Sequence, residues 1–151
     1  MEYREYKDGD EKGIISLFNE VFKDDRNEEY WNWQYKEFPS GEPIICLAEE
    51  ENSIIGQTTL LPSVINYKGK EILGGYSIDS MVKNEYRRQG IYVNLAKQSY
   101  EKGVEQGIKF RFGFPILDAL LGLTDRLGAS IVDDIPIFIR VYRLVSLKIR
   151  L

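Results

Sequence analysis

The stretch EYRRQGIYVNLAKQSYEKG, Glu85 to Gly103, places two arginines and a glycine directly before an apolar helical repeat. A helix N-terminus has four backbone N–H groups without intrahelical partners and the positive end of the helix dipole, so it attracts anions, above all phosphate. Gly90 lets a ligand approach the backbone without a Cβ in the way, and Arg87 and Arg88 add forked donors. The stretch predicts a pyrophosphate site; the alternative is a solvated polar loop.

The elements on either side of this turn are a strand and a helix. Residues 76–82, YSIDSMV, predict a strand whose alternate residues face opposite ways. One face would carry Tyr76, Ile78, Ser80 and Val82, and the other Ser77, Asp79 and Met81. The helix would bury the apolar residues at helical spacing, which are Tyr92, Leu95, Ala96, Tyr100 and Val104. Gly107 would end it.

The rest of the chain predicts a mixed sheet with helices on its faces. A short first strand leads to a helix over 11–23 with Asp10 as its N-cap, and a second helix follows from 27. Hairpins are predicted over 43–62 and 63–76. A strand over 108–115, a helix over 116–128 and an extended segment over 129–151 complete the order β-α-α-β-β-β-α-β-α-β. The second helix carries an aromatic stripe, which is either core or the wall of a substrate site: Tyr30, Trp31, Trp33, Tyr35 and Phe38.

Composition indicates one soluble globular domain spanning residues 1–151. The net charge of −4 disfavours a general nucleic-acid binder, and the late apolar stretch is broken by arginines and a lysine, so it predicts no membrane span. A single cysteine, Cys46, and a charged N-terminus fit a cytoplasmic protein. The chain has no histidine, which argues against zinc sites and histidine-dependent triads. We expect no metal.

With its strand, turn and helix, the run Arg87-Arg88-Gln89-Gly90-Ile91-Tyr92 resembles the coenzyme A site of the GNAT acyltransferase superfamily, whose pattern is Arg/Gln-x-x-Gly-x-Gly/Ala. The element order is similar over nearly the whole chain. The resemblance implies an α+β fold with a mostly antiparallel twisted sheet, splayed between strands 4 and 5. It also implies an N-acyltransferase that moves an acetyl group from acetyl-CoA to a primary amine by direct attack.

The resemblance also assigns residues to the coenzyme A site. The amides of Arg88, Gln89, Gly90, Ile91 and Tyr92 would bind the pyrophosphate beside Arg87, and backbone groups of Met81 and Val82 would bind the pantetheine arm. Catalysis would come mostly from positioning and from a strand amide that stabilises the oxyanion. The acceptor would be a small molecule or a peptide.

The chain departs from the family pattern at several positions. Tyr92 stands at the last glycine or alanine of the pattern, and its side chain either crowds the phosphate or points away. Ile116 stands where the family often has an asparagine, and Thr124 where it often has an acidic tyrosine. A seventh strand is missing after the sixth. We therefore expect either a homodimer that completes the C-terminal sheet edge or a missing partner segment, with the chain as the N-terminal part of a longer protein.

Two side chains are candidates for acid–base chemistry. Asp79, in mid-strand, is either a general base with a raised pKa or a hydrogen-bonded structural carboxylate. Tyr142 is either a general acid or an ordinary core or surface tyrosine. Two further functions stay open beside the transferase: a degenerate GNAT-fold binding or regulatory module, and half of a two-part transferase. The apolar run around Cys46 predicts that this cysteine is a packing residue.

Overall fold

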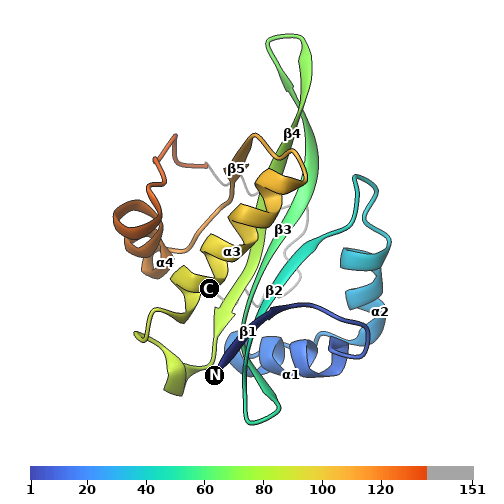
Figure 1. Ribbon diagram of the computed structural model, residues 1–151, viewed down its shortest axis with the longest axis vertical. Helices are drawn as coiled ribbons and strands as arrows, with labels where there is room; N and C mark the ends of the chain where they lie inside the picture. Colours follow the sequence, from blue (N-terminus) through green and yellow to red (C-terminus); the bar gives the residue numbers. More distant parts are fainter. Residues whose placement is uncertain (136–151) are drawn as a thin grey trace, which may run out of the picture.

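The computed structural model describes residues 1–135 and shows a five-stranded sheet with helices on both faces (Figure 1). The strands lie in chain order across the sheet: β1 (Glu2–Glu5), β2 (Ile44–Glu50), β3 (Ser53–Tyr67), β4 (Lys70–Val82) and β5 (Phe110–Phe112). The first four pair antiparallel, whereas β5 lies parallel to β4. The predicted α+β fold with a mostly antiparallel sheet is confirmed.

The helices divide the core into two clusters, one on each face of the sheet. On one face lie α1 (Glu11–Phe22) and α2 (Glu28–Trp31), the latter continued by a π-helical turn over Asn32–Lys36. On the other face lies α3 (Ile91–Glu105), which crosses β2 and β3 in front of the sheet in Figure 1. The short α4 (Leu117–Leu121) and a π-helical turn over Gly122–Arg126 follow β5.

The two predicted hairpins share one continuous strand, because β3 runs through both of them. Pairing between β2 and β3 ends at Leu60, while β3 and β4 stay paired as far as Tyr67 and Lys70. The far part of these strands is therefore a two-stranded ribbon, which projects at the top of Figure 1. Pro62 also lies beyond the end of β2, but before this ribbon begins, because its partner Gly75 still pairs with Arg111 of β5. A proline is tolerated there because β3 has no second neighbour to bond.

Strand β4 contains a bulge at Asp79. Gln57 of β3 pairs with Met81, and Thr59 pairs with Ile78. Strand β4 therefore has one residue more than β3 between these two pairs. Asp79 has a φ of +46°. A non-glycine residue in the left-handed region costs about 1–3 kcal/mol, and it persists only where surrounding contacts hold it.

The bulge reverses the side-chain alternation of β4. Tyr76, Ile78 and Met81 pack with the α1–α2 cluster, whereas Val82 belongs to the α3 cluster. The Ser80 hydroxyl lies on the α3 side as well, beside Tyr92. The prediction that placed Tyr76, Ile78, Ser80 and Val82 on one face is therefore wrong, because the alternation that it assumed is interrupted at Asp79.

Helix α3 approaches the sheet closely through small residues. Its buried side chains include Leu95, Ser99 and Gly103, and a Cβ on Gly103 would come within 3.0 Å of Leu60. The predicted burial of Val104 is wrong: that side chain is 72% exposed. The face that contacts the sheet therefore carries large apolar residues near its start, Ile91 and Leu95, and small residues, Ser99 and Gly103, farther along.

The C-terminal part is described only as far as residue 135. Gly107 and Gly128, both with left-handed backbone, follow α3 and the turn after α4 as predicted. The predicted strand over 108–115 is shorter, Phe110–Phe112, and residues 129–135 have no regular secondary structure. The remainder of the predicted extended segment, Tyr142 included, lies outside the described residues. In the described part of the chain, no helix combines the length and the apolar character that a membrane crossing requires.

Candidate functional site

The turn before α3 forms a cradle of backbone N–H groups. Arg88 and Gly90 both have left-handed backbone, with φ of 64° and 80°, and Gly90 is the N-cap of the helix. The first amide that enters the helical ladder is that of Asn94, which donates to the Gly90 carbonyl at 3.1 Å. Within residues 1–135, the amides of residues 88–93 have no acceptor. Successive unpaired N–H groups at such a turn are a typical anion-binding arrangement.

The space in front of Gly90 is open. An added Cβ at Gly90 would meet no atom within 4 Å, so the region that a side chain would fill is free for a ligand. The next residue, Ile91, is 1% exposed and packs in the α3 cluster with Val82 and Leu95. Packing of Ile91 therefore fixes the helix end against β4, while Arg88 and Gln89 before it are exposed.

The side chains around the cradle are arranged unequally. Arg87 turns back to the sheet, where its Nε donates to the Val82 carbonyl at 3.1 Å. Gln89 Nε2 reaches the Glu85 carbonyl at 3.4 Å. Arg88 is exposed, and its guanidinium has no hydrogen-bond or ion-pair partner in the described part of the chain. Of the two arginines, Arg88 is the one free to contact an anion.

Tyr92 directs its side chain away from the space in front of Gly90. Its ring packs against the α3 cluster, and a Cβ on Gly122 would lie 3.8 Å from it. Burial raises the pKa of the Tyr92 phenol, while the Arg111 charge and the Ser80 hydroxyl act in the opposite direction. The phenol is therefore neutral at physiological pH, and Tyr92 offers its amide to the cradle without covering it.

One side of β4 has no partner strand over its last residues. Pairing between β4 and β5 ends at Tyr76 and Phe112, so among residues 1–135 no strand pairs with residues 77–82 on that side, which we call the open side. The Lys83 amide donates to the Ile55 carbonyl of β3 at 2.9 Å. Bonded and non-bonded pairs alternate in an antiparallel ladder. The register therefore turns the backbone of Met81 toward β3 and that of Val82 toward the open side.

On the face of the sheet covered by α1 and α2, three side chains converge on the Asp79 carboxylate. Its Oδ2 accepts hydrogen bonds from Arg26 NH1 at 2.5 Å, from Gln34 Nε2 at 3.0 Å and from the Tyr35 hydroxyl. The Arg26 and Asp79 side chains are only 11% and 15% exposed. This arrangement matches the hydrogen-bonded structural carboxylate, one of the two interpretations that the sequence leaves open.

Arg26, the ion-pair partner of Asp79, is itself fixed by contacts of its side chain and of its backbone. The guanidinium carbon lies 3.3 Å from the ring centre of Phe18 and 4.5 Å from that of Tyr30. Its backbone is bonded to Asn19, whose side chain both accepts from the Arg26 amide and donates to its carbonyl, each at 2.9 Å. The sequence offers no local signal for this role, because Arg26 lies in the α1–α2 loop and 53 positions from Asp79.

The network continues into β3 through buried polar groups. Burial, followed by the Asp79 charge, raises the pKa of the Tyr35 phenol, and the nearby Thr59 hydroxyl acts in the opposite direction. Thr59 in turn accepts from Gln57 Nε2 at 3.0 Å. Gln57 Oε1 and Gln34 Oε1 are buried and have no donor in the described part of the chain. Such acceptors are where water or a ligand N–H would bind.

The residues that depart from the family pattern offer no substitute acid. Ile116 is 69% exposed at the N-cap of α4. The Thr124 hydroxyl donates to the Leu120 carbonyl at 3.1 Å, which occupies it within its own helix.

Cys46 is buried, and burial raises the pKa of its thiol to about 11, so it is a packing residue as predicted. Among residues 1–135, no group of three or more metal-ligating side chains is found.

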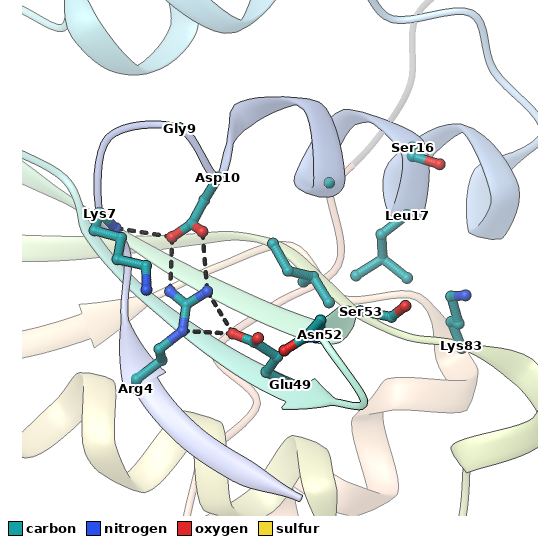
Figure 2. A pocket seen from close by; sticks show the side chains of 12 residues that line it. Arg4, Lys7, Gly9, Asp10, Ser16, Leu17, Glu49, Asn52, Ser53 and Lys83 are labelled. Carbon is teal, nitrogen blue, oxygen red and sulfur yellow. Dashed lines mark hydrogen bonds and ion pairs between the residues drawn. The ribbon is translucent and has the colours of Figure 1, made fainter.

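A separate hollow of about 420 Å³ lies between α1 and the β2–β3 turn, and no predicted site residue lines it. Figure 2 shows its centre, where the Arg4 guanidinium lies between the carboxylates of Asp10 and Glu49. Asp10 occupies the N-cap position of α1, but its side chain makes no capping bond. Asp10 is therefore the N-cap as predicted, but Arg4, across the first turn, takes the carboxylate that would otherwise cap the helix.

Two comparisons place this geometry among known proteins. A family model described as an acetyltransferase (GNAT) domain matches residues 2–132. No curated protein sequence matches the chain. Similar solved structures are numerous, and three that cover more than nine tenths of both chains serve as examples.

The first is glucosamine-6-phosphate N-acetyltransferase from Arabidopsis thaliana, at 14% identity and a TM-score of 0.73 over 92% of this chain and 98% of the other. The second is an aminoglycoside 6'-N-acetyltransferase from Acinetobacter haemolyticus, at 16% and 0.70 over 95% and 100%. The third, a predicted acetyltransferase with acetyl-CoA from Clostridium acetobutylicum, reaches 16% and 0.74 over 91% and 94%. At these identities the likeness establishes the fold.

Proposed function

The chain belongs to the GNAT acetyltransferase family, and we propose that it transfers an acetyl group from acetyl-CoA to a primary amine. The amine nitrogen attacks the thioester carbonyl directly, the C–S bond breaks, and coenzyme A leaves as the thiol after taking up a proton. The proton that the amine loses passes to solvent. The protein contributes chiefly by holding the two reactants in place.

The observation that carries this proposal is the cradle before α3. Its amides at residues 88–93 have no acceptor in the described chain, and the space in front of Gly90 is open. A pyrophosphate carries the charge and the oxygen atoms that such a site binds. Arg88, exposed beside these amides, supplies a cation for the same group.

The open side of β4 extends from the cradle and suits the pantetheine arm. Arg87 connects the two, because its side chain is bonded to the Val82 carbonyl. Among residues 1–135 the Val82 N–H has no acceptor, and it is the backbone donor that we assign to the arm. Met81, which the sequence also indicated, has its backbone turned toward β3 by the register.

The acceptor is proposed to be a small molecule that carries a primary amine. Two of the similar structures are acetyltransferases of amino sugars, named for glucosamine-6-phosphate and for aminoglycosides. The net charge of −4 favours approach of a cation. An acid–base role for Asp79 or Tyr142 stays a prediction.

The test is amine-dependent release of coenzyme A thiol from acetyl-CoA, followed with a chromogenic thiol reagent over a panel of amines and amino sugars. The buried Cys46, with its pKa of about 11, should contribute little background. We expect thiol release that depends on the amine and is abolished in Gly90→Glu. If no amine releases thiol although acetyl-CoA binds, the transferase assignment fails.

A second candidate is a GNAT-fold module that binds coenzyme A without turnover. The observation in its favour is Thr124, whose hydroxyl is bonded within its own helix at a position where an acid is expected. This candidate predicts binding of acetyl-CoA and of coenzyme A with no amine-dependent release. The same assay therefore separates the two.

A further inference from the structure

We propose that Arg26, Gln34 and Tyr35 are positioning residues for the coenzyme A edge of β4. They hold the bulge at Asp79, and the bulge sets which backbone and side-chain groups of the following residues face the open side. This inference rests on the proposed function for its consequence in binding, but its structural part does not. It links the α1–α2 face of the sheet to a site on the other face.

The first step of the argument is that the bulge needs holding. Asp79 is a non-glycine residue at a φ of +46°, a conformation that is retained where neighbouring contacts fix it. Three donors from two places in the chain reach the same carboxylate oxygen: Arg26 in the α1–α2 loop, and Gln34 and Tyr35 in the turn after α2. No closer neighbour in the sequence contributes a side chain to it.

The second step concerns what the bulge does downstream. Without the extra residue, the alternation set by Ile78 would turn Ser80 and Val82 toward α1 and α2. With it, both face α3, and the Ile91 side chain at the helix end packs with Val82. The bulge therefore determines that the Val82 backbone faces the open side of β4, next to the cradle, while the Val82 side chain packs with Ile91.

The third step distinguishes this role from general-base catalysis. The three donors all occupy Oδ2 of Asp79, and Oδ1 accepts no hydrogen bond within residues 1–135. Only Oδ1 is left for a base to act through, whereas the three donors at Oδ2 fix the carboxylate in place. A positioning carboxylate depends on Arg26, and its loss weakens binding of the thioester rather than proton transfer.

The decisive variant is Arg26→Gln, and Arg4→Gln is its matched control. Both arginines form ion pairs with little exposure, at 11% for Arg26 and 16% for Arg4. Arg4 bonds Asp10 and Glu49, and the hollow that it lines contains no residue of the cradle. Both substitutions should lower the melting temperature, so melting alone does not decide the question.

Two readouts decide it. Titration calorimetry with acetyl-CoA should show Kd rising more than about tenfold in Arg26→Gln, because a small misplacement of a binding edge is costly. In Arg4→Gln the Kd should stay within about twofold, because Arg4 bonds Asp10 and Glu49 and not Asp79. Hydrogen exchange without ligand should accelerate at the Met81 and Lys83 amides in Arg26→Gln only. These two amides are the ones that the register bonds to β3.

A milder variant covers the case in which Arg26→Gln does not fold. Tyr35→Phe removes one donor from Asp79 and keeps the buried ring, so it should raise both the Kd and the exchange rate at Met81 in the same direction but less. The proposal is overturned if a folded Arg26→Gln or Tyr35→Phe binds acetyl-CoA like wild type with unchanged exchange. If wild type itself does not bind, the proposed function fails, while the exchange readout still tests the role of the network.

Discussion

Gly90 and Gly107 lie at the two ends of α3 with nearly the same left-handed backbone, at φ of 80° and 86°. Neither would bring an added Cβ within 4 Å of another atom. Both positions therefore require a left-handed backbone, which favours glycine. They differ in location, because only Gly90 lies in the cradle. Paired substitutions at the two positions separate an effect on the cradle from an effect on the helix.

The first prediction is that Gly90→Ala and Gly107→Ala destabilise the fold to a similar extent. An L-residue in the left-handed region costs about 1–2 kcal/mol, and neither new methyl group meets a neighbour that would add to this. Urea denaturation of both variants gives the comparison. A loss of stability at one position and none at the other would contradict this account of the two helix ends.

The second prediction tests how α3 is held against the sheet. Leu95 is fully buried in the α3 cluster, so Leu95→Ala should lower the free energy of unfolding by about 2–5 kcal/mol. Val104, in the same helix, is 72% exposed, and Val104→Ala should change it by no more than about 0.5 kcal/mol. Equal losses in the two variants would show that the helix packs through a different face.

The third prediction concerns acid. Hydrogen bonds from the Tyr6 hydroxyl and from Lys36 lower the pKa of Glu11 to about 2, against an ordinary value of 4.5, although burial acts the other way. The folded pKa lies below the unfolded one, so this stabilisation is complete above about pH 4.5 and is lost as the pH falls toward about 2.

Glu11→Gln should therefore melt at a lower temperature than wild type at neutral pH, with the difference shrinking as the pH falls through that window. Melting curves across the pH series measure it. Glu105→Gln is the control, because Glu105 is 68% exposed in its ion pair with Lys102. A difference between Glu11→Gln and wild type that stays constant down to about pH 2 would contradict the assignment.

Sequence reasoning located the cradle because its signals are local. A glycine before an apolar helical repeat, with adjacent arginines, identifies the turn without any knowledge of the fold. Such a pattern does not indicate which of the two arginines points toward the ligand. Arg87 turns back to Val82, and this depends on where β4 ends relative to the helix.

The bulge at Asp79 could not be predicted in the same way. Its cause is distributed over Arg26, Gln34 and Tyr35, none of which is near Asp79 in the chain. Aspartate also carries no conformational signal as strong as glycine. The sequence therefore predicts strict alternation along the strand, and the residues beyond the bulge face the opposite way from that prediction.

Two other differences have the same kind of origin. Asp10 is the residue type that caps helices, yet Arg4 from the first strand takes its carboxylate. In α3, an apolar pattern favoured Val104, whereas close approach to the sheet selected Gly103. In each case a tertiary contact outweighs a local preference, and the identity of that contact is not encoded in neighbouring residues.

The most direct test of the central claim, that the cradle before α3 binds the pyrophosphate of coenzyme A, is calorimetric titration of wild type, Gly90→Glu and Gly107→Glu with acetyl-CoA. Both variants place a glutamate at a left-handed position with open space around it, at opposite ends of one helix. The account predicts that wild type and Gly107→Glu bind acetyl-CoA and that Gly90→Glu does not. Equal binding by the two variants, or no binding by a folded wild-type chain, would contradict it.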